Sequence, residues 1–450
     1  GGGRGPAPRL GTGCEMRAWI AAAVLILAVL ILLPSPAAGA SHTQGRPHEP
    51  QPTDSDRGAT AALAGTVHID DYQLGRKSVP TMHLVRPSRR RSRRKSRRQG
   101  RSRKPYSIRR GEGAADGAAL LRFAVFGDTH YWARSPARAL WERRAAAQAI
   151  RDGLIIDEVD AIMPKLLHQL SEFAASGADF AVHTGDAVCG GSTFRMKPAE
   201  YLASLREYYA LEEALAPWPI IHVPGNHDLD PSPNWPQRGG TMAWREIMCG
   251  NKTRAMSLGS CDPGMPNYGS IRVAGWRVLF LDAQDGLARD TDGHGHIGSE
   301  QLSWLAEELE DTSSASEQVI LVMHQLLVEP PGASWIERTQ DFIDNRHEVL
   351  QLLSKFDHIR LCLHGHVHAN SFVTFLGIAF ITTASAIEFP MHWREVSVFK
   401  CEIRLTTHTV DAPLQRERSR RADRRRGRND VKLGDSLANS LVIQFCKNPQ

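Results

Sequence analysis

Five short apolar runs in this chain each end in a cluster of Gly, His, Asp or Asn residues. A short continuous apolar run that stops in this way is typical of a buried parallel strand. In an alternating β/α architecture the carboxyl ends of such strands share one edge of the sheet, where ligands bind. The five runs read "LLRFAVFGDTH" from residue 120, "ADFAVHTGD" from 178, "WPIIHVPGNHD" from 218, "QVILVMHQ" from 318 and "LCLHGHVHAN" from 361.

Helix-length segments separate most of these runs, which predicts helices over 152–175, 198–215 and 299–310. After residue 371 the strand-like runs "SFVTFLG", "IAFITTASA" and "EVSVFKCEIRL" follow without helices, so we expect the sheet to end in antiparallel strands. The Gly- and Pro-rich segment 229–267 is long enough to form a lid over the functional edge. The alternative is that this insertion is a surface loop with no role at that edge.

Residues 1–40 contain the pattern of an export signal that starts at Met16. Arg17 precedes an apolar run over 18–33, and the small residues "AAGA" allow cleavage after Ala40. The run is short for a membrane span, which favours a cleaved signal over a retained anchor. We therefore expect an exported protein, either periplasmic or extracellular.

Two Arg-rich tracts account for the formal charge of +6, and the remainder of the chain is acidic. Residues 86–110 hold 14 Lys or Arg and no acid, while 416–428 hold 8 Arg against 2 acids. Such runs attract polyanions, or they are solvated, disordered linkers. We expect a disordered linker over 41–118, a catalytic domain over 119–412, and an Arg-rich tract with a C-terminal strand over 413–450.

The seven Cys residues form no C-x-x-C motif, which argues against a zinc ribbon. In an exported protein Cys249 and Cys261 are candidates for a loop disulfide. Two free thiols are the alternative, since spacing alone cannot establish a pair.

The final run places His364, His366 and His368 at every second position. In an extended segment, the side chains of residues two apart point to the same face, so His366 and His368 can contact the same ligand. Neutral imidazole is a common ligand of borderline metals, so the pair predicts half of a metal site. For His364 we favour a supporting or simple loop role over substrate contact.

The other strand ends supply the second half of that site. In chain order they carry D-x-H at 128–130, G-D at 185–186, G-N-H-D at 225–228 and a single His at 324, followed by G-H-x-H at 365–368. This series resembles the calcineurin-like metallophosphoesterase family, over residues 120–410. The resemblance implies an α/β fold in which layered mixed β-sheets are flanked by helices, an αββα sandwich.

Two departures argue against the purple acid phosphatase branch of that family. Its members carry a Tyr three residues after the bridging Asp, where this chain has Cys189, and they lack the His that this chain has at 130. The opening strand and the 299–310 helix look more like the cyclic-nucleotide phosphodiesterase and ADP-ribose or CDP-alcohol pyrophosphatase side of the family.

The resemblance also implies a role for each motif residue. Asp186 would bridge two metal ions, since a carboxylate can share two cations through its two oxygens. His227 would protonate the leaving oxygen, with Asp228 orienting it. Helix capping is the alternative for Asp128 and Asp186. The first ion would be held by Asp128, His130, Asp186 and His368, and the second by Asp186, Asn226, His324 and His366.

Four further histidines are not expected to bind metal. His183 and His222 are predicted to face the core or to lie at a strand edge, and His294 and His296 to lie in a mobile loop, with substrate contact as the alternative.

The resulting expectation is a dinuclear metal-dependent phosphoesterase that hydrolyses a phosphomonoester, phosphodiester or nucleotide pyrophosphate through attack by metal-bound hydroxide. Its cofactors would be two divalent or trivalent ions (Mn, Fe, Zn or Ni), and its partner a small-molecule or nucleotide phosphoester. No protein partner is indicated. The alternative is a polyanion- or surface-binding protein that uses its Arg-rich tracts, with the phosphoesterase domain as a secondary or degenerate module.

Overall fold

Two mixed β-sheets packed face to face form the centre of the fold, and helices cover their outer faces. The computed structural model describes residues 117–136, 138–140, 142, 155–190, 194, 196–216, 218–228, 239–250, 267–285, 294–330, 341–424, 429–434 and 439–446, together with the backbone of 65–68 and 106–108.

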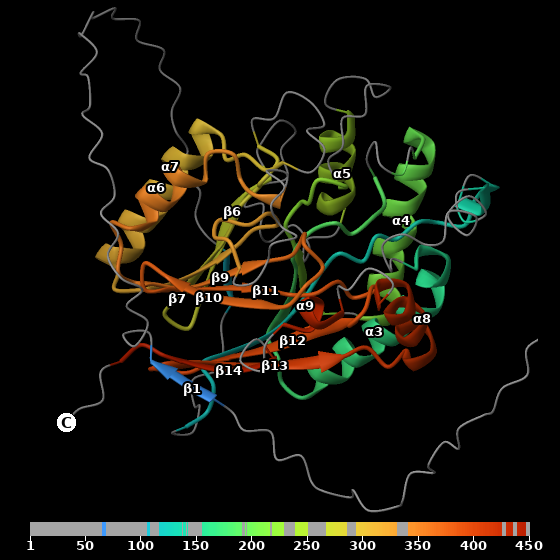
Figure 1. The fold of residues 1–450 in the computed structure, drawn as a ribbon. Helices are drawn as coiled ribbons and strands as arrows, with labels where there is room; N and C mark the ends of the chain where they lie inside the picture. Colours follow the sequence, from blue (N-terminus) through green and yellow to red (C-terminus); the bar gives the residue numbers. More distant parts are fainter. Residues whose placement is uncertain are drawn as a thin grey trace, which may run out of the picture. The chain divides into compact units, whose positions relative to one another are not determined.

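Sheet A has the strand order β1-β14-β13-β12-β3-β4-β5 in the described part of the chain. The strands β3, β4 and β5 run parallel, whereas β12 runs antiparallel to β3 and pairs with β13 as a hairpin. In Figure 1 β12, β13 and β14 lie side by side. The bounds are β1 Gly65–His68, β3 Leu121–Phe126, β4 Phe180–His183, β5 Ile220–His222, β12 His392–Val398, β13 Glu402–Thr409 and β14 Ser440–Gln444.

Sheet B has the order β10-β11-β9-β8-β7-β6-β2 over the same described residues. Its central strands β7, β8, β9 and β11 are parallel, and β10 and β6 flank them in antiparallel pairs. The bounds are β2 Tyr106–Ile108, β6 Gly269–Val273, β7 Trp276–Phe280, β8 Gln318–Val322, β9 Ile359–His364, β10 Ser371–Phe375 and β11 Ile378–Thr382.

The helices pack on opposite outer faces of the two sheets. The helices α3, α4 and α5 share a buried cluster with sheet A, and α6 and α7 share one with sheet B. Their bounds are η2 Ile156–Glu158, α3 Val159–Ala175, α4 Pro198–Leu215, α5 Gly239–Cys249, α6 Ser299–Ser314, α7 Arg346–Leu353, α8 Pro413–Arg424 and α9 Asn429–Leu433.

Alternation along each strand divides the core into three layers. In β3, Phe123 and Val125 point into the cluster between the two sheets, while Ala124 and Phe126 join the helix-covered cluster. Successive side chains of a strand point to opposite faces, so a strand covered on both faces must be apolar on both. The unbroken apolar runs of the sequence are therefore explained, and the predicted αββα sandwich is confirmed.

The structure refines three sequence predictions. The run "EVSVFKCEIRL" spans parts of the two strands of the β12–β13 hairpin instead of a single strand. β11 pairs in parallel with β9, so the end of sheet B is not wholly antiparallel. Helix α5 lies within the predicted lid at 229–267, whose flanking residues 229–238 and 251–266 lie outside the described residues.

The N-terminal predictions fall largely outside the described residues. The signal-like segment at 18–33 is among them, as is most of the predicted linker at 41–118. Within that linker, β1 pairs with β14 and β2 pairs with β6, so the segment contributes an edge strand to each sheet. No described helix combines the length and apolarity needed to cross a bilayer.

The second Arg-rich tract is not a disordered linker over 416–424, where it forms most of α8. Arg418 donates a hydrogen bond to Glu158 and pairs with Asp157 at 2.6 Å. Ser419 is fully buried. One side of this basic helix is therefore part of the folded domain.

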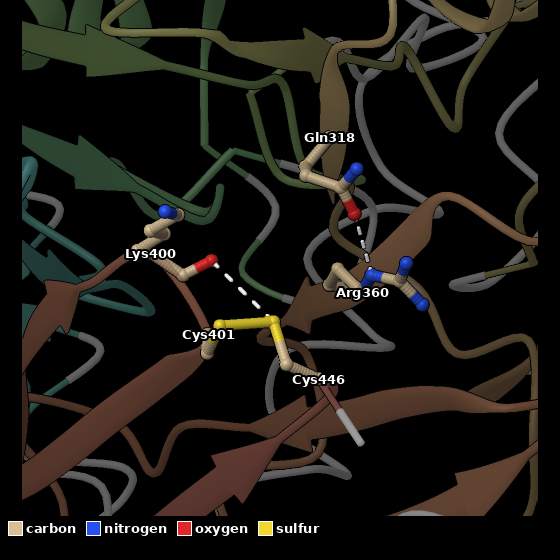
Figure 2. The surroundings of a disulfide bond; sticks show 5 residues. All are labelled: Gln318, Arg360, Lys400, Cys401 and Cys446. Carbon is tan, nitrogen blue, oxygen red and sulfur yellow. Dashed lines mark hydrogen bonds between the residues drawn. A yellow bond between two sulfur atoms is a disulfide. The ribbon is translucent and has the colours of Figure 1, made fainter. Parts of the chain in front are cut away.

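A disulfide joins the residue before β13 to a residue after β14. Cys401 precedes β13 and Cys446 follows β14, and the sulfur of Cys446 also approaches the Lys400 carbonyl at 3.9 Å (Figure 2). The cross-link closes a loop of 45 residues that contains α8 and α9. Constraining a loop of that length in the unfolded chain contributes about 4 kcal/mol in the chain-entropy description.

The other cysteines divide into free and paired ones. Cys189 and Cys362 are free and buried. Cys249 is disulfide-bonded, and its partner lies outside the described residues, so the proposed pair with Cys261 stays a prediction.

Candidate metal centre

Loops that follow five strands meet at one edge of the sandwich. Three of them follow β3, β4 and β5 of sheet A, and two follow β8 and β9 of sheet B. Backbone hydrogen bonds connect them: the Asp128 amide donates to Gly185, the His130 amide to Asp186, and the Gly365 amide to His324. The parallel course of these strands is the reason why motifs far apart in the sequence converge here.

The first donor group consists of Asp128, His130 and His368. The Nε2 atom of His368 lies 3.0 Å from Nε2 of His130 and 3.4 Å from Oδ1 of Asp128. Two imidazole nitrogens that face each other at this distance can share only one proton, or both can direct lone pairs at a cation.

The second donor group consists of Asp186, His324 and His366. The Nε2 atom of His324 lies 3.1 Å from Oδ2 of Asp186 and 3.1 Å from Nδ1 of His366. The opposite nitrogen of His324 donates to the Thr184 carbonyl at 2.7 Å. That bond fixes the ring and leaves Nε2 as the nitrogen that faces the group.

Asn226 lies beside this second group. Its neighbour His227 donates a backbone hydrogen bond of 2.9 Å to Oδ1 of Asp186. The side-chain oxygen of Asn226 is buried and has no hydrogen-bond partner among the described residues. A buried amide oxygen without a partner is costly, and a cation would satisfy it.

His227 borders both groups. One of its ring nitrogens lies within 4.8 Å of donor atoms of His130 and Asp186. Its Nδ1 donates to the Gly190 carbonyl at 2.6 Å, and the ring packs against Phe194 with centroids 5.1 Å apart. The other ring nitrogen, Nε2, is therefore the one available for proton transfer.

Asp228 does not orient His227, contrary to our expectation. Its Oδ1 accepts hydrogen bonds from the amides of Ala187 and Val188 at 2.9 and 3.2 Å, and its Oδ2 accepts one from Gly225 at 3.0 Å. Asp228 therefore ties the loop after β5 to the loop after β4. The Gly190 carbonyl takes the orienting role, which no side-chain motif could reveal.

The backbone at the site adopts an unusual conformation. Left-handed φ angles between 41° and 72° are found at five of the predicted ligand residues, a region that residues with a side chain seldom adopt. These residues are Asp128, His130, Asp186, His366 and His368.

The motif glycines are required because side chains of neighbouring loops approach their Cα atoms closely. A Cβ atom at Gly365 would lie 2.6 Å from Oδ2 of Asp128, and one at Gly225 would collide with Oδ1 of Asp186. Each glycine therefore lets a carboxylate lie directly against the neighbouring loop.

Glu388 and Lys432 were not identified from the sequence. The Glu388 carboxylate accepts a hydrogen bond from Nδ1 of His368 through Oε2 and contacts the Lys432 ammonium through Oε1. Both side chains are almost fully buried. A carboxylate behind a ligating histidine is a known arrangement at metal sites, but neither residue lies in a local motif that would have indicated it.

The other five histidines considered in the sequence lie outside both donor groups. His183 and His222 are buried and stacked with centroids 4.8 Å apart, which confirms their predicted core location. His364 is buried, and its Nδ1 donates to the Gln325 carbonyl at 2.8 Å. His294 pairs with Asp344 at 2.9 Å, and the His296 amide donates to Ala283.

The donor set fits cations of intermediate softness. It combines carboxylate oxygens, imidazole nitrogens and one amide oxygen, which suits Mn, Fe, Zn or Ni. Without a cation the cluster takes up protons. Burial lowers the pKa of His324, but Asp186 and Asp128 outweigh it and raise that pKa to about 9. Burial also lowers the pKa of His368, but Glu388 and Asp128 outweigh it and raise that pKa to about 10.

Residues 121–370 match the family model of the calcineurin-like phosphoesterases. Together with the relatives below, this match defines a metal-dependent phosphoric ester hydrolase. Because the matched segment is more than half of the chain, the protein belongs to the calcineurin-like phosphoesterase family.

Two relatives illustrate the similarity. The 3',5'-cyclic adenosine monophosphate phosphodiesterase CpdA of Escherichia coli is 27% identical over 284 residues, which are 61% of this chain and 80% of the relative. The manganese-dependent ADP-ribose/CDP-alcohol diphosphatase of Arabidopsis thaliana is 25% identical over 234 residues, 47% of this chain and 72% of the relative. The names of these two relatives confirm the resemblance inferred from the motifs. Neither relative is named as a purple acid phosphatase.

Among solved structures, a dimetal phosphatase from Danio rerio superposes with a TM-score of 0.48. Its sequence is 16% identical, and the superposition covers 64% of this chain and 96% of that chain.

Metal binding should release protons and tighten as the pH rises. His324 and His368 hold protons at neutral pH in the metal-free protein, and an imidazole nitrogen must lose its proton to bind a cation. The apparent affinity for Mn²⁺ should therefore increase with pH and level off above about pH 10. Calorimetric titrations of metal-free protein, in two buffers with different ionisation enthalpies, measure the protons released.

The variant His294→Gln is the matched control, because that histidine lies outside both groups and should leave proton release unchanged. Affinity that stays constant between about pH 6 and pH 8 would contradict the prediction.

Proposed function

We propose that this protein is an exported two-metal phosphodiesterase or diphosphatase that acts on a small nucleotide substrate. The observation that carries the proposal is the convergence of the two donor groups on Asp186. One of its oxygens lies 3.1 Å from His324 of the second group, and the same oxygen lies 3.9 Å from His130 of the first. A carboxylate in this position can serve two cations at once.

Each motif residue then has a defined role. We assign Asp128, His130 and His368 to the first ion, Asn226, His324 and His366 to the second, and Asp186 to both. Two bound cations would supply Lewis-acid activation of the phosphoryl group and of the attacking water.

His227 is proposed as the general acid. As an imidazolium it would keep its Nδ1 proton on the Gly190 carbonyl and donate its Nε2 proton to the departing oxygen. The buried ring of Phe194 packs against the imidazole and limits its movement. This arrangement holds the transferable proton next to the two donor groups.

Nucleotide substrates are supported by the named relatives. One is a cyclic adenosine monophosphate phosphodiesterase and the other an ADP-ribose/CDP-alcohol diphosphatase, both of which cleave phosphoester or phosphoanhydride bonds in nucleotides. The proposal extends that substrate class to this chain and leaves the metal and the individual nucleotide open.

Export is supported by the signal-like segment and by the cysteines. Disulfides persist in oxidising compartments and are rare in the cytosol. The Cys401–Cys446 disulfide and the paired state of Cys249 are consistent with an oxidising location.

A second candidate function is polyanion binding through the first Arg-rich tract at 86–110. Three arginines of the second tract are paired with acids, since Arg418 pairs with Asp157 and Glu158 while Arg420 and Arg421 pair with Glu417. The first tract contains no acid that could neutralise it locally. Its charge is therefore the better candidate for binding phosphate backbones.

The main test is metal content combined with a substrate panel. Fully loaded, active protein should contain two metal ions per chain by elemental analysis. It should hydrolyse cyclic AMP or ADP-ribose with higher kcat/KM than nitrophenyl phosphate when loaded with Mn, Zn, Ni or Fe in turn. Asp186→Asn should lose metal and activity, because both cations depend on that carboxylate.

Asp344→Asn is the matched control, since Asp344 pairs with His294 away from both donor groups. Zero or one metal in active wild-type protein would refute the two-metal proposal. Activity confined to phosphomonoesters would refute the nucleotide substrate class.

The role of His227 is tested by leaving-group dependence. His227→Ala should retain both metals but lose about 10²- to 10⁴-fold of activity on alkyl phosphoesters. Nitrophenyl phosphoesters should lose much less, because their leaving oxygen is stable without protonation. Equal losses on the two substrate types would exclude His227 as the acid, and loss of a metal would indicate that it is a ligand.

Export predicts a defined mature N-terminus. Expression of the chain in a host with a secretory pathway should give a processed protein that begins at Ser41, detected by intact-mass measurement and N-terminal sequencing. Replacement of Leu25 by Arg within the apolar run should block processing, while Ser55→Arg outside it should not. Cytosolic, unprocessed wild-type protein would contradict the proposal.

Polyanion binding predicts a strong dependence on salt. Substitution of the Lys and Arg residues of 86–104 by Gln should remove binding of duplex DNA and leave turnover of a small phosphoester unchanged. Each phosphate contact that is lost should reduce the slope of log affinity against log salt by about 0.9. Arg420→Gln with Arg421→Gln is the control on α8, and binding that does not weaken with salt would count against a charge mechanism.

A further inference from the structure

A buried carboxylate and a buried ammonium lie directly behind the first donor group. Glu388 follows β11, and Lys432 belongs to α9, downstream of the family match. Their exposed fractions are 2% and 3%. Glu388 accepts the Nδ1 hydrogen of His368 with one oxygen and contacts Lys432 with the other, so the three side chains form a continuous chain.

This arrangement determines which nitrogen of His368 enters the site. Because Nδ1 is held by Glu388, Nε2 turns toward His130 and Asp128, at 3.0 and 3.4 Å. Glu388 thus fixes both the tautomer and the direction of the ring.

The stability of the fold does not by itself explain why Glu388 and Lys432 are buried together. Lys and Glu are among the residues least often fully buried, and a buried ion pair is commonly no more stabilising than apolar side chains of the same size. Its presence next to a donor group is better explained by the charge and geometry that it imposes on His368.

The segment that supplies Lys432 is tied to the same loops. The Asn370 amide donates to the Lys432 carbonyl at 3.0 Å, and Asn370 lies two residues after His368. The Phe389 amide, next to Glu388, donates to Ser419 of α8 at 2.7 Å. The Cys401–Cys446 disulfide encloses both helices.

We propose that Lys432 is a positioning residue for the first metal ion. It holds the Glu388 carboxylate in place, and Glu388 in turn holds the His368 ring. The inference rests on the proposed function in one respect, namely that the two donor groups bind metal.

The test measures metal affinity by equilibrium dialysis of the full chain against Mn²⁺, with elemental analysis as the readout. Lys432→Met should weaken one of the two ions about 10- to 100-fold and leave the other unchanged. Arg421→Met is the matched control, since that side chain is 76% exposed on α8 and should bind both ions as the wild type does.

A double-mutant cycle separates positioning from general damage. Glu388→Gln should weaken the same ion, and addition of Lys432→Met to it should cause no further loss, because the lysine acts through the carboxylate. Independent, additive losses would overturn the proposal. Weakening of both ions together with a lower Tm of the metal-free protein would also overturn it.

If Lys432→Met alone fails to fold, the double variant remains informative because it leaves no lone buried charge. Weaker binding of one ion, equal to that of Glu388→Gln, supports the proposal, and wild-type binding overturns it. Wild-type protein that binds no metal would instead refute the proposed function, so the two failures are distinguishable.

Discussion

The Asp186 carboxylate is the group on which the arrangement of the site depends. One oxygen accepts the His227 amide, and the other faces His324, while the Asp186 carbonyl accepts the His130 amide. Burial alone would raise the pKa of Asp186, but His324, His227 and His130 lower it well below the ordinary range. A buried anion among imidazoles is stable only with protons or metal ions nearby, so the loops that surround it are organised around positive charge.

The sandwich provides the second constraint, because the donors come from both sheets. Sheet A contributes the loops with Asp128, Asp186 and Asn226, and sheet B contributes those with His324 and His366. The apolar cluster between the sheets sets the distance across which these loops meet. Dense packing of that layer transmits even a small change in core volume to the separation of the donors.

The sequence predicted the donors because each follows an apolar run within a few residues. That local pattern sufficed for the strands β3, β4, β5, β8 and β9, whereas the grouping of Asp128, His130 and His368 came from the family resemblance. It could not reveal Glu388 or the Gly190 carbonyl, which act through contacts between distant segments. Asp228 was assigned to the wrong partner, because adjacency in sequence does not determine which amides a buried carboxylate meets.

The left-handed backbone at the site limits which residues each donor position can accept. Gly, Asn, Asp and His tolerate such φ angles, whereas β-branched side chains do not. Five of the seven predicted donors are restricted in this way, and Asn226 and His324 are not. An attempt to change the metal preference by exchanging donor types therefore has its widest choice of residues at those two positions, both of which we assign to the proposed second ion.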